Sequence, residues 1–171
     1  MNPNVIAIPI GFENTRWESS FGPKTDLMLE VNKFTIDPTS LIYFNCNLNT
    51  NTHVRSDCLD FAVKSKLVNI DAPNLNYKDY LNRIRQHRFT LSPRGNGLDC
   101  HRTWECLMMK RVPVLKLDGT LQRLYKNLPV LFVNDWTDLN HMNLLELYES
   151  YSFEDQNYLF FNYWKNLIFV K

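Results

Sequence analysis

Short, continuous hydrophobic runs recur along this chain, separated by polar segments and by segments with helical spacing. Apolar residues fill these runs without alternation, which is typical of strands buried on both faces of a parallel sheet. The predicted strands are Val5–Ile10, Leu41–Cys46, Lys66–Ile70, Phe89–Leu91, Val112–Leu115 and Pro129–Val133. Because strands and helices alternate from residue 41 onward, the pattern predicts an α/β fold: a Rossmann-like parallel sheet flanked by helices on both faces.

Four helices are predicted around these strands. The first follows the polar segment Asn47–Thr52 and ends near Lys64. The second spans Tyr77–Gln86, the third spans residues 99–109, and the fourth begins at Thr137 or Asp138, either of which can cap it. Residues 12–40 are expected to be irregular, because two X-Pro turn signals interrupt them.

The tail Asn157–Val170 is aromatic and apolar. A membrane-surface helix would have this apolar character, but it would also carry several cations. The tail has only Lys165, with Lys171 just beyond it. We therefore expect the tail to pack across the domain or against another domain.

One stretch, residues 88–105, carries most of the chemical information. After a short apolar strand come Arg94-Gly95-Asn96-Gly97, and then a helix start that bears Arg102. A loop of small residues lets backbone N–H groups approach an anion, and the helix N-terminus adds partial positive charge. The two arginines can hold phosphate oxygens with paired donors. The stretch predicts a site for a phosphorylated ligand, although Asn-Gly alone could mark a plain turn.

Glu105 lies three residues after Arg102, so the two side chains share one helix face. A carboxylate at this place suits two neighbouring hydroxyls, as on a ribose. The alternative is a surface ion pair, which would contribute little to stability. His101 either contacts phosphate or sugar or is exposed. Asp99 is taken as the N-cap of the helix, and Trp104 as a core residue rather than a base-stacking one.

A second polar loop follows the strand that ends at Cys46. Thr50, Asn51 and Arg55, with Asn49 before them, resemble another anion-binding loop at a helix start, or equally a plain cap with a solvated arginine. Ligands in parallel sheets bind beyond the carboxyl ends of the strands, so both loops are expected at one edge. Glu13 and Asn14, after the first run, are weaker ligand candidates.

Composition and charge argue against several classes of protein. The chain has 171 residues, enough for one domain, and its net charge of +1 argues against a nucleic-acid binder. No run reaches the roughly 18 apolar residues of a membrane span. The four cysteines show no CxxC spacing, so neither zinc nor a disulfide framework is expected. With no signal-peptide pattern at its start, the chain is predicted to be cytoplasmic.

Residues 89–114 resemble the exostosin-like glycosyltransferases. The matching pattern is a strand, Ser92-Pro93-Arg94-Gly95, a helix with Arg102-x-x-Glu105, and a strand with Pro113-Val114. Weaker likeness extends over most of residues 5–140, including Ile8-Pro9-Ile10-Gly11 and Asp135-Trp136. The resemblance implies the C-terminal, donor-binding half of a GT-B enzyme, which binds a nucleotide-diphosphate sugar of UDP or GDP type for transfer to an acceptor hydroxyl.

Site roles follow from the same resemblance. Glu105 would bind the donor ribose, while Arg94 and Arg102 would neutralise the diphosphate. No metal or other cofactor is required for donor binding, and no DxD-type motif occurs. The acceptor, a carbohydrate or glycoconjugate, and the general base would come from a first domain, so this half leaves the catalytic base unassigned.

The chain departs from the family pattern in two ways. Lys110-Arg111 replaces the usual Gly-Cys, although glycine is favoured at the left-handed end of a helix. The chain also starts where a first domain would be finishing. Residues 1–40 are therefore interpreted as a remnant or linker, and the acceptor-binding half is expected to be missing or on another chain.

Two rival hypotheses remain at this stage. A non-catalytic relic or interaction module would keep the fold without sugar transfer. A methyltransferase or dehydrogenase would share the Rossmann-like sheet, but the loop lacks the G-x-G-x-x-G spacing.

Overall fold

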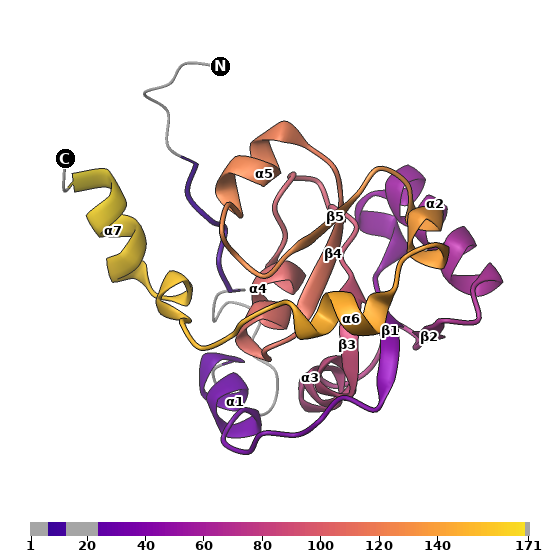
Figure 1. The fold of residues 1–171 in the computed structure, drawn as a ribbon, viewed down its shortest axis with the longest axis horizontal. Coiled ribbons are helices and arrows are strands. Elements are labelled where there is room, and N and C mark those ends of the chain that lie inside the picture. Colours follow the sequence, from indigo (N-terminus) through magenta and orange to yellow (C-terminus); the bar gives the residue numbers. More distant parts are fainter. Residues whose placement is uncertain (1–6, 13–23, 170–171) are drawn as a thin grey trace.

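A five-stranded parallel sheet forms the centre of the computed structural model, which describes residues 7–12 and 24–169 (Figure 1). Its strands are β1 (Ser40–Phe44), β2 (Val68–Ile70), β3 (His87–Leu91), β4 (Val112–Lys116) and β5 (Leu131–Val133). Every neighbouring pair is parallel, in the order β2-β1-β3-β4-β5. The predicted α/β, Rossmann-like fold is therefore confirmed.

The order of the strands creates a switch point. Ile42 of β1 pairs with Val68 of β2 on one side and with Phe89 of β3 on the other. The chain thus leaves β1 in one direction to form β2 and then crosses back to form β3. In doubly wound sheets, ligands bind in the crevice beyond the carboxyl ends of the two strands at such a point.

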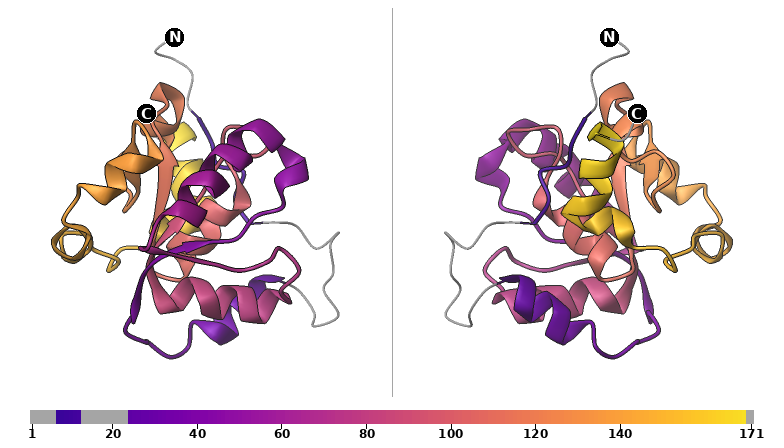
Figure 2. Two further views of the ribbon diagram at one scale, coloured as in Figure 1. Left: turned by 90° about the vertical axis from the view of Figure 1, so that its right-hand side faces the viewer. Right: turned by 90° about the vertical axis from the view of Figure 1, so that its left-hand side faces the viewer.

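Helices cover both faces of the sheet (Figure 2). The α-helices are α1 (Lys24–Val31), α2 (Thr52–Lys64), α3 (Tyr77–Gln86), α4 (His101–Met108), α5 (Gly119–Leu124), α6 (Leu144–Glu149) and α7 (Phe161–Phe169). Three 3-10 helices accompany them, η2 (Leu48–Thr50), η3 (Trp136–Asn140) and η4 (Asn157–Leu159). Ile42 and Phe44 pack with α2, η3 and α6, whereas Tyr43 packs with α1, α3 and α4. Alternate residues of one buried strand thus supply two separate cores.

Several elements differ from the sequence predictions. Residues 24–31 form α1, so the expectation of irregular structure is wrong there; Leu27, Met28 and Val31 pack in the same core as α3. The remnant or linker assignment of residues 1–40 stays a prediction. Helix α5 was not predicted. No strand forms in residues 7–12, and the rest of the predicted strand Val5–Ile10 lies outside the described residues.

The predicted helix from Thr137 or Asp138 is also wrong in detail, because it is split in two. Asp135, not Thr137 or Asp138, is the N-cap of η3, and its carboxylate accepts the backbone N–H of Thr137 at 3.0 Å. Asn143 then caps α6, whose first residue is Leu144. Polar capping groups at two places start two short helices instead of one.

Helix α4 ends without the usual glycine. Lys110 has φ of 56°. Its N–H donates to the Leu107 carbonyl and that of Arg111 to the Cys106 carbonyl, both at 3.0 Å. This is the Schellman hydrogen-bond pattern. The helix therefore ends as a glycine-capped helix would, with a lysine in the left-handed conformation at an energetic cost.

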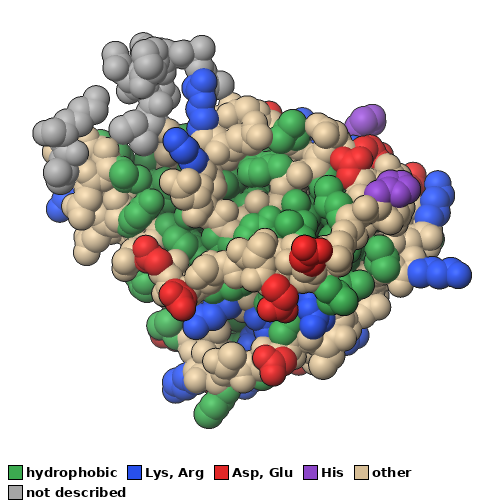
Figure 3. All heavy atoms as spheres, in the orientation of Figure 1, with side chains coloured by type: hydrophobic (Ala, Val, Ile, Leu, Met, Phe, Trp, Pro, Cys, Tyr) green, Lys and Arg blue, Asp and Glu red, His purple; other side chains and the backbone are tan. Residues whose placement is uncertain are grey.

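The C-terminal helix α7 is held mainly by Trp164. Its ring lies edge-on to Trp104 with centroids 5.9 Å apart, and its indole N–H donates to the Tyr158 carbonyl at 2.7 Å. Phe161 and Phe169 remain exposed. Figure 3 shows hydrophobic side chains on this face of the molecule, some of them over this helix. The predicted packing of the tail across the domain is thus seen at Trp164, while most of α7 stays uncovered by described residues.

Candidate anion-binding site

Two loops meet at the carboxyl ends of β1 and β3. The side-chain amide of Asn51 donates to the Gly95 carbonyl at 2.9 Å, and Arg55 Nε donates to the Arg94 carbonyl at 3.3 Å. Arg55 also donates through Nη1 to the Asn47 carbonyl. The two loops predicted separately from the sequence therefore form one structure. We call Thr50, Asn51, Arg55, Gly95 and Arg102 the switch-point site.

Local capping places Arg55. Asn51 is the N-cap of α2, and its side-chain oxygen accepts the Val54 N–H at 3.4 Å. Arg55 follows one turn later and is only 8% exposed. Burial lowers the pKa of the Arg55 guanidinium, and the charge of Arg102 lowers it further. The reading of Arg55 as a plain solvated arginine is therefore wrong, because it is buried beside a second cation.

Gly95 is a position where only glycine fits comfortably. A Cβ atom there would lie 3.2 Å from Arg55 Nη2 and 3.3 Å from Thr50 Cγ2. Gly97 has more room, since its Cβ would lie 3.6 Å from the Asp99 carbonyl oxygen. The close approach of the loop to α2 therefore explains the first glycine of the motif, whereas packing does not require the second.

Arg102 is the least satisfied cation of the site. Its Nε is buried and has no hydrogen-bond partner among the described residues. Burial by itself lowers the pKa of the Arg102 guanidinium, but the Tyr80 phenol and the Cys100 and Cys46 thiols raise it by more, so its net shift is upward. A charged donor without a full set of partners is costly unless something else completes it.

The N-terminus of α4 adds to this positive environment. Its N-cap is Cys100, which makes no side-chain capping bond to the helix. The thiol instead lies 3.2 Å from the Ser92 hydroxyl, which in turn is 2.9 Å from the Thr103 hydroxyl. The helix start thus lacks the side-chain acceptor that usually occupies it, and an anion is the natural substitute.

Asp99 is not the predicted N-cap. Its carboxylate accepts the Trp104 indole N–H at 3.0 Å, the Ile10 N–H at 2.7 Å and the Tyr125 hydroxyl. It therefore ties α4 to α5 and to the N-terminal segment. Trp104 is buried in the core, as expected.

Glu105 lies behind the site rather than in it. The side chain is 5% exposed, and the Tyr77 and Tyr80 hydroxyls donate to its two oxygens at 2.9 Å each. Burial raises the pKa of Tyr80, and the negative charge of Glu105 raises it further, so this hydroxyl stays protonated and donates. The alternative of a surface ion pair between Arg102 and Glu105 is wrong, since Glu105 is buried against α3.

The remaining candidates lie at the rim. Arg94, Asn96 and Gly97 are exposed. His101 Nδ1 is 2.7 Å from the Gly11 carbonyl oxygen, so this histidine is joined to the N-terminal segment. Glu13 and Asn14 lie outside the described residues. The structure therefore brings Thr50, Asn51, Arg55, Gly95 and Arg102 together, and it places Glu105 behind them, against α3.

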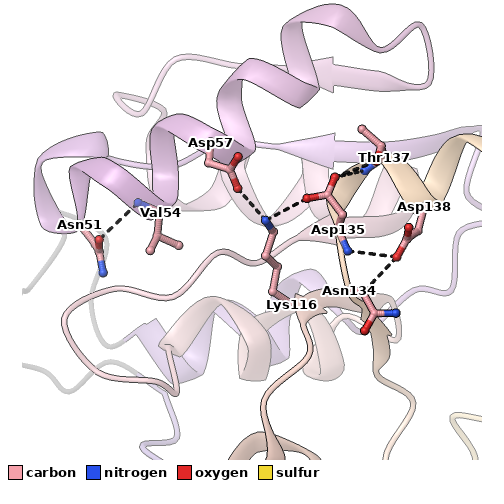
Figure 4. A network of polar contacts seen from close by, with 8 residues as sticks. All are labelled: Asn51, Val54, Asp57, Lys116, Asn134, Asp135, Thr137 and Asp138. Atoms are coloured by element: carbon pink, nitrogen blue, oxygen red, sulfur yellow. Dashed lines mark hydrogen bonds and ion pairs between the residues drawn. The ribbon is translucent and has the colours of Figure 1, made fainter.

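Sequence reasoning missed an ion-pair network at the end of β4. The Lys116 ammonium lies between the carboxylates of Asp57 at 2.8 Å and Asp135 at 3.3 Å (Figure 4). Hydrogen bonds from Thr137 lower the pKa of Asp135, and Lys116 lowers it further. The sequence does show a lysine at the end of an apolar strand, at the carboxyl edge of the sheet where ligands are expected. Its two carboxylate partners, however, come from distant segments of the chain.

Comparisons with known proteins match no family to this chain. A scan against models of protein families found no match, and a search of curated proteins found no similar sequence. Within residues 7–12 and 24–169, no helix is long and apolar enough to cross a membrane. The same residues contain no cluster of three or more His, Cys, Asp or Glu side chains that could hold a metal ion.

Proposed function

We propose that this chain binds a nucleotide-diphosphate sugar at the switch-point site, as the donor-binding domain of a glycosyltransferase. The observation that carries the proposal is that Arg55 is held against the loop around Gly95, close enough to Arg102 for the two charges to interact, beside the start of α4, which has no side-chain cap. Both arginines and this helix start lie beyond the carboxyl ends of β1 and β3, where doubly wound sheets bind their ligands. The Ser92-Pro93-Arg94-Gly95 resemblance supplies the ligand class.

The site has the chemistry that a pyrophosphate needs. Two guanidinium groups offer charged donors, and Arg102 Nε is not used by any residue that the structure describes. Backbone N–H groups at the start of α4 and in the loop around Gly95 add neutral donors. In sugar transfer, the same groups would stabilise the charge that develops on the departing nucleotide diphosphate. The acceptor and the general base would come from a separate acceptor-binding domain.

Glu105 is proposed to bind the donor ribose. A ribose contact there needs a hydroxyl to reach a carboxylate that Tyr77 and Tyr80 already occupy. A carboxylate has about four acceptor positions, so further hydrogen bonds are chemically available. The role of Glu105 in ribose binding therefore stays a prediction that depends on access past the two tyrosines.

Isothermal titration with UDP, GDP and ADP tests the proposal. We expect binding by at least one of them, and we expect Arg102→Ala to weaken it by about 1.5–3 kcal/mol because a charge-assisted contact is lost. Arg83→Ala is the matched control, since Arg83 is half-exposed and its guanidinium is already paired with Asp71. A folded sample that binds none of these nucleotides would refute the proposal.

Transfer is tested separately from binding. The protein is incubated with UDP-glucose, UDP-N-acetylglucosamine and GDP-mannose, and nucleotide diphosphate release is measured with and without sugar acceptors. Release that depends on Arg102 supports an enzyme. Nucleotide binding with no release under any condition supports the relic alternative instead.

A further inference from the structure

A hydrophobic cavity of about 290 Å³ lies between α7 and the N-terminal segment of residues 7–12, and it shares no residue with the switch-point site (Figure 1). We call it the α7 cavity. Buried aromatic side chains form its floor, including Trp104 at 1% exposed and Trp164 at 9% exposed. Ile8 and Phe169 line it as well and are 61% and 75% exposed, so they lie at its rim. A ligand here can be enclosed on its inner side by rings that water does not reach.

Both walls of the α7 cavity are held by hydrogen bonds within the protein. On one side, the Ile10 N–H donates to the Asp99 carboxylate at 2.7 Å, and His101 Nδ1 lies 2.7 Å from the Gly11 carbonyl oxygen. On the other side, the indole N–H of Trp164 ties α7 to η4. A cavity with fixed walls binds its ligand at a smaller cost in conformational entropy than one that must first be ordered.

The floor of the cavity calls for an apolar ligand. Its two tryptophans already use their indole N–H groups, Trp104 with the Asp99 carboxylate and Trp164 with the Tyr158 carbonyl. They therefore offer ring surface instead of hydrogen-bond donors. A cavity of about 150 Å³ with aliphatic and aromatic walls binds benzene, so a cavity of about 290 Å³ has room for about ten to twelve carbon atoms.

Lys165 gives the cavity a charge at its mouth. Its side chain is exposed, and it is the only charged side chain among the described residues that line the cavity. It makes no hydrogen bond or ion pair with the described part of the chain. A lysine can lay its methylene stem along apolar surface and keep its ammonium in water. A carboxylate at the end of an apolar ligand would therefore find a cation here and no competing acid.

We infer that the α7 cavity binds an apolar molecule with one terminal carboxylate, of the size of a medium-chain fatty acid. The apolar part lies on the tryptophan floor, and the carboxylate pairs with Lys165. A flat membrane surface fits the site less well, because it would leave the buried floor untouched and a membrane-surface helix usually carries several cations. The inference does not depend on nucleotide binding.

The first test is a series of chain lengths. Hexanoate, octanoate and decanoate are titrated calorimetrically, each below the concentration at which it forms micelles. Affinity should rise about tenfold for every two CH₂ groups added, because each group is removed from water. Octanoate should also bind about two- to fivefold more tightly than octanol, which lacks the charge. Absence of decanoate binding, or an affinity that does not depend on chain length, would overturn the inference.

A matched pair of substitutions on α7 places the ligand. Ile168→Trp fills the cavity from a residue that lines it and is 38% exposed. Leu167→Trp makes the same kind of change at the next residue, which is 47% exposed and lines a different groove, toward α5. Circular dichroism confirms that both variants fold. Decanoate affinity should fall at least tenfold in the first variant only, and equal losses in both variants would refute the assigned cavity.

The role of Lys165 is tested by removing its charge. Lys165→Met should lower the affinity for octanoate to that for octanol and leave octanol binding unchanged, whereas Lys165→Arg should keep the preference for the acid. Lys126→Met, at an exposed lysine outside the cavity lining, is the control and should change neither affinity. A preference for octanoate that survives Lys165→Met would remove this lysine from the site and overturn the carboxylate assignment.

Two further measurements separate other occupants of the same cavity. Vesicles of phosphatidylcholine and phosphatidylglycerol are sedimented with the protein, and sedimentation velocity measures its oligomeric state. Vesicle binding without binding of soluble decanoate would replace the fatty acid by a membrane surface. A dimer that Ile168→Trp dissociates and that decanoate does not affect would replace it by a second copy of the chain. None of these assays contains a nucleotide, so failure of the inference leaves the proposed function intact.

Discussion

Two pairs of arginines lie at opposite edges of the same sheet; Arg55, Arg85 and Arg111 are buried, and Arg102 is partly buried. Arg85 and Arg111 precede β3 and β4 at the amino edge, whereas Arg55 and Arg102 follow β1 and β3 at the carboxyl edge. Arg111 donates to the carbonyls of Arg85 at 2.8 Å, Lys110 at 2.7 Å and Ile36 at 2.7 Å, and to the Tyr148 hydroxyl at 3.3 Å.

The carboxyl-edge pair differs in whether its hydrogen-bond donors all have partners. Arg55 is bonded to two backbone carbonyls, but Arg102 keeps a buried Nε with no partner among the described residues. Where carbonyls satisfy the donors, an arginine holds segments of the chain together. Where a donor stays unused beside a second cation and an open helix start, the structure has capacity for an anion.

Replacing Arg111 should have the largest effect. Arg111→Met leaves three carbonyls and a hydroxyl without their donor, so the free energy of unfolding is expected to fall by about 3–5 kcal/mol. Urea denaturation measures this. Nucleotide affinity of the folded fraction should not change, and an affinity loss at this residue would break the distinction between the two pairs.

Replacing Arg102 should produce the opposite pattern. Arg102→Met is expected to change the free energy of unfolding by at most about 1 kcal/mol, because the lost hydrogen bonds are few, while phosphate binding weakens by about 1.5–3 kcal/mol. Urea denaturation and calorimetric titration are run on the same preparation. A stability loss as large as that of Arg111→Met would make Arg102 a structural residue.

Lys110, the residue in the left-handed conformation before Arg111, offers a test with a smaller expected effect. Lys110→Gly removes the steric cost of φ at 56°, so thermal unfolding should show stabilisation by about 0.5–1 kcal/mol. Lys126→Gly, on an exposed residue after α5, serves as a control without that strain. Destabilisation by Lys110→Gly would mean that the lysine side chain itself contributes to holding Arg111.

The smallest effect is expected at an exposed arginine. Arg83 forms a two-point ion pair with Asp71 at 2.8 and 3.0 Å, and its side chain is 47% exposed. Arg83→Ala should cost less than about 1 kcal/mol in urea denaturation, because surface ion pairs are weak in water. A larger loss would mean that the exposure of an arginine does not predict how much it contributes to the free energy of unfolding.

The sequence by itself determined the sheet and the edge at which the candidate site lies. Short apolar runs such as Leu41–Cys46 favour buried strands, and the polar loops that follow the strands of a parallel sheet lie at its carboxyl edge. Short helices were harder to predict: α1 has only three buried positions, and its burial depends on contact with α3.

Tertiary structure alone decided which charged side chains have a full set of hydrogen-bond partners. Arg102 and Arg111 are the same residue type. Arg111 donates to the carbonyls of Ile36 and Arg85, whereas Arg102 keeps a donor that no described residue accepts. Glu105 is likewise enclosed by two tyrosines from α3. The physical reason is that hydrogen-bond partners come from segments far apart in the chain, and local pattern carries no information about them.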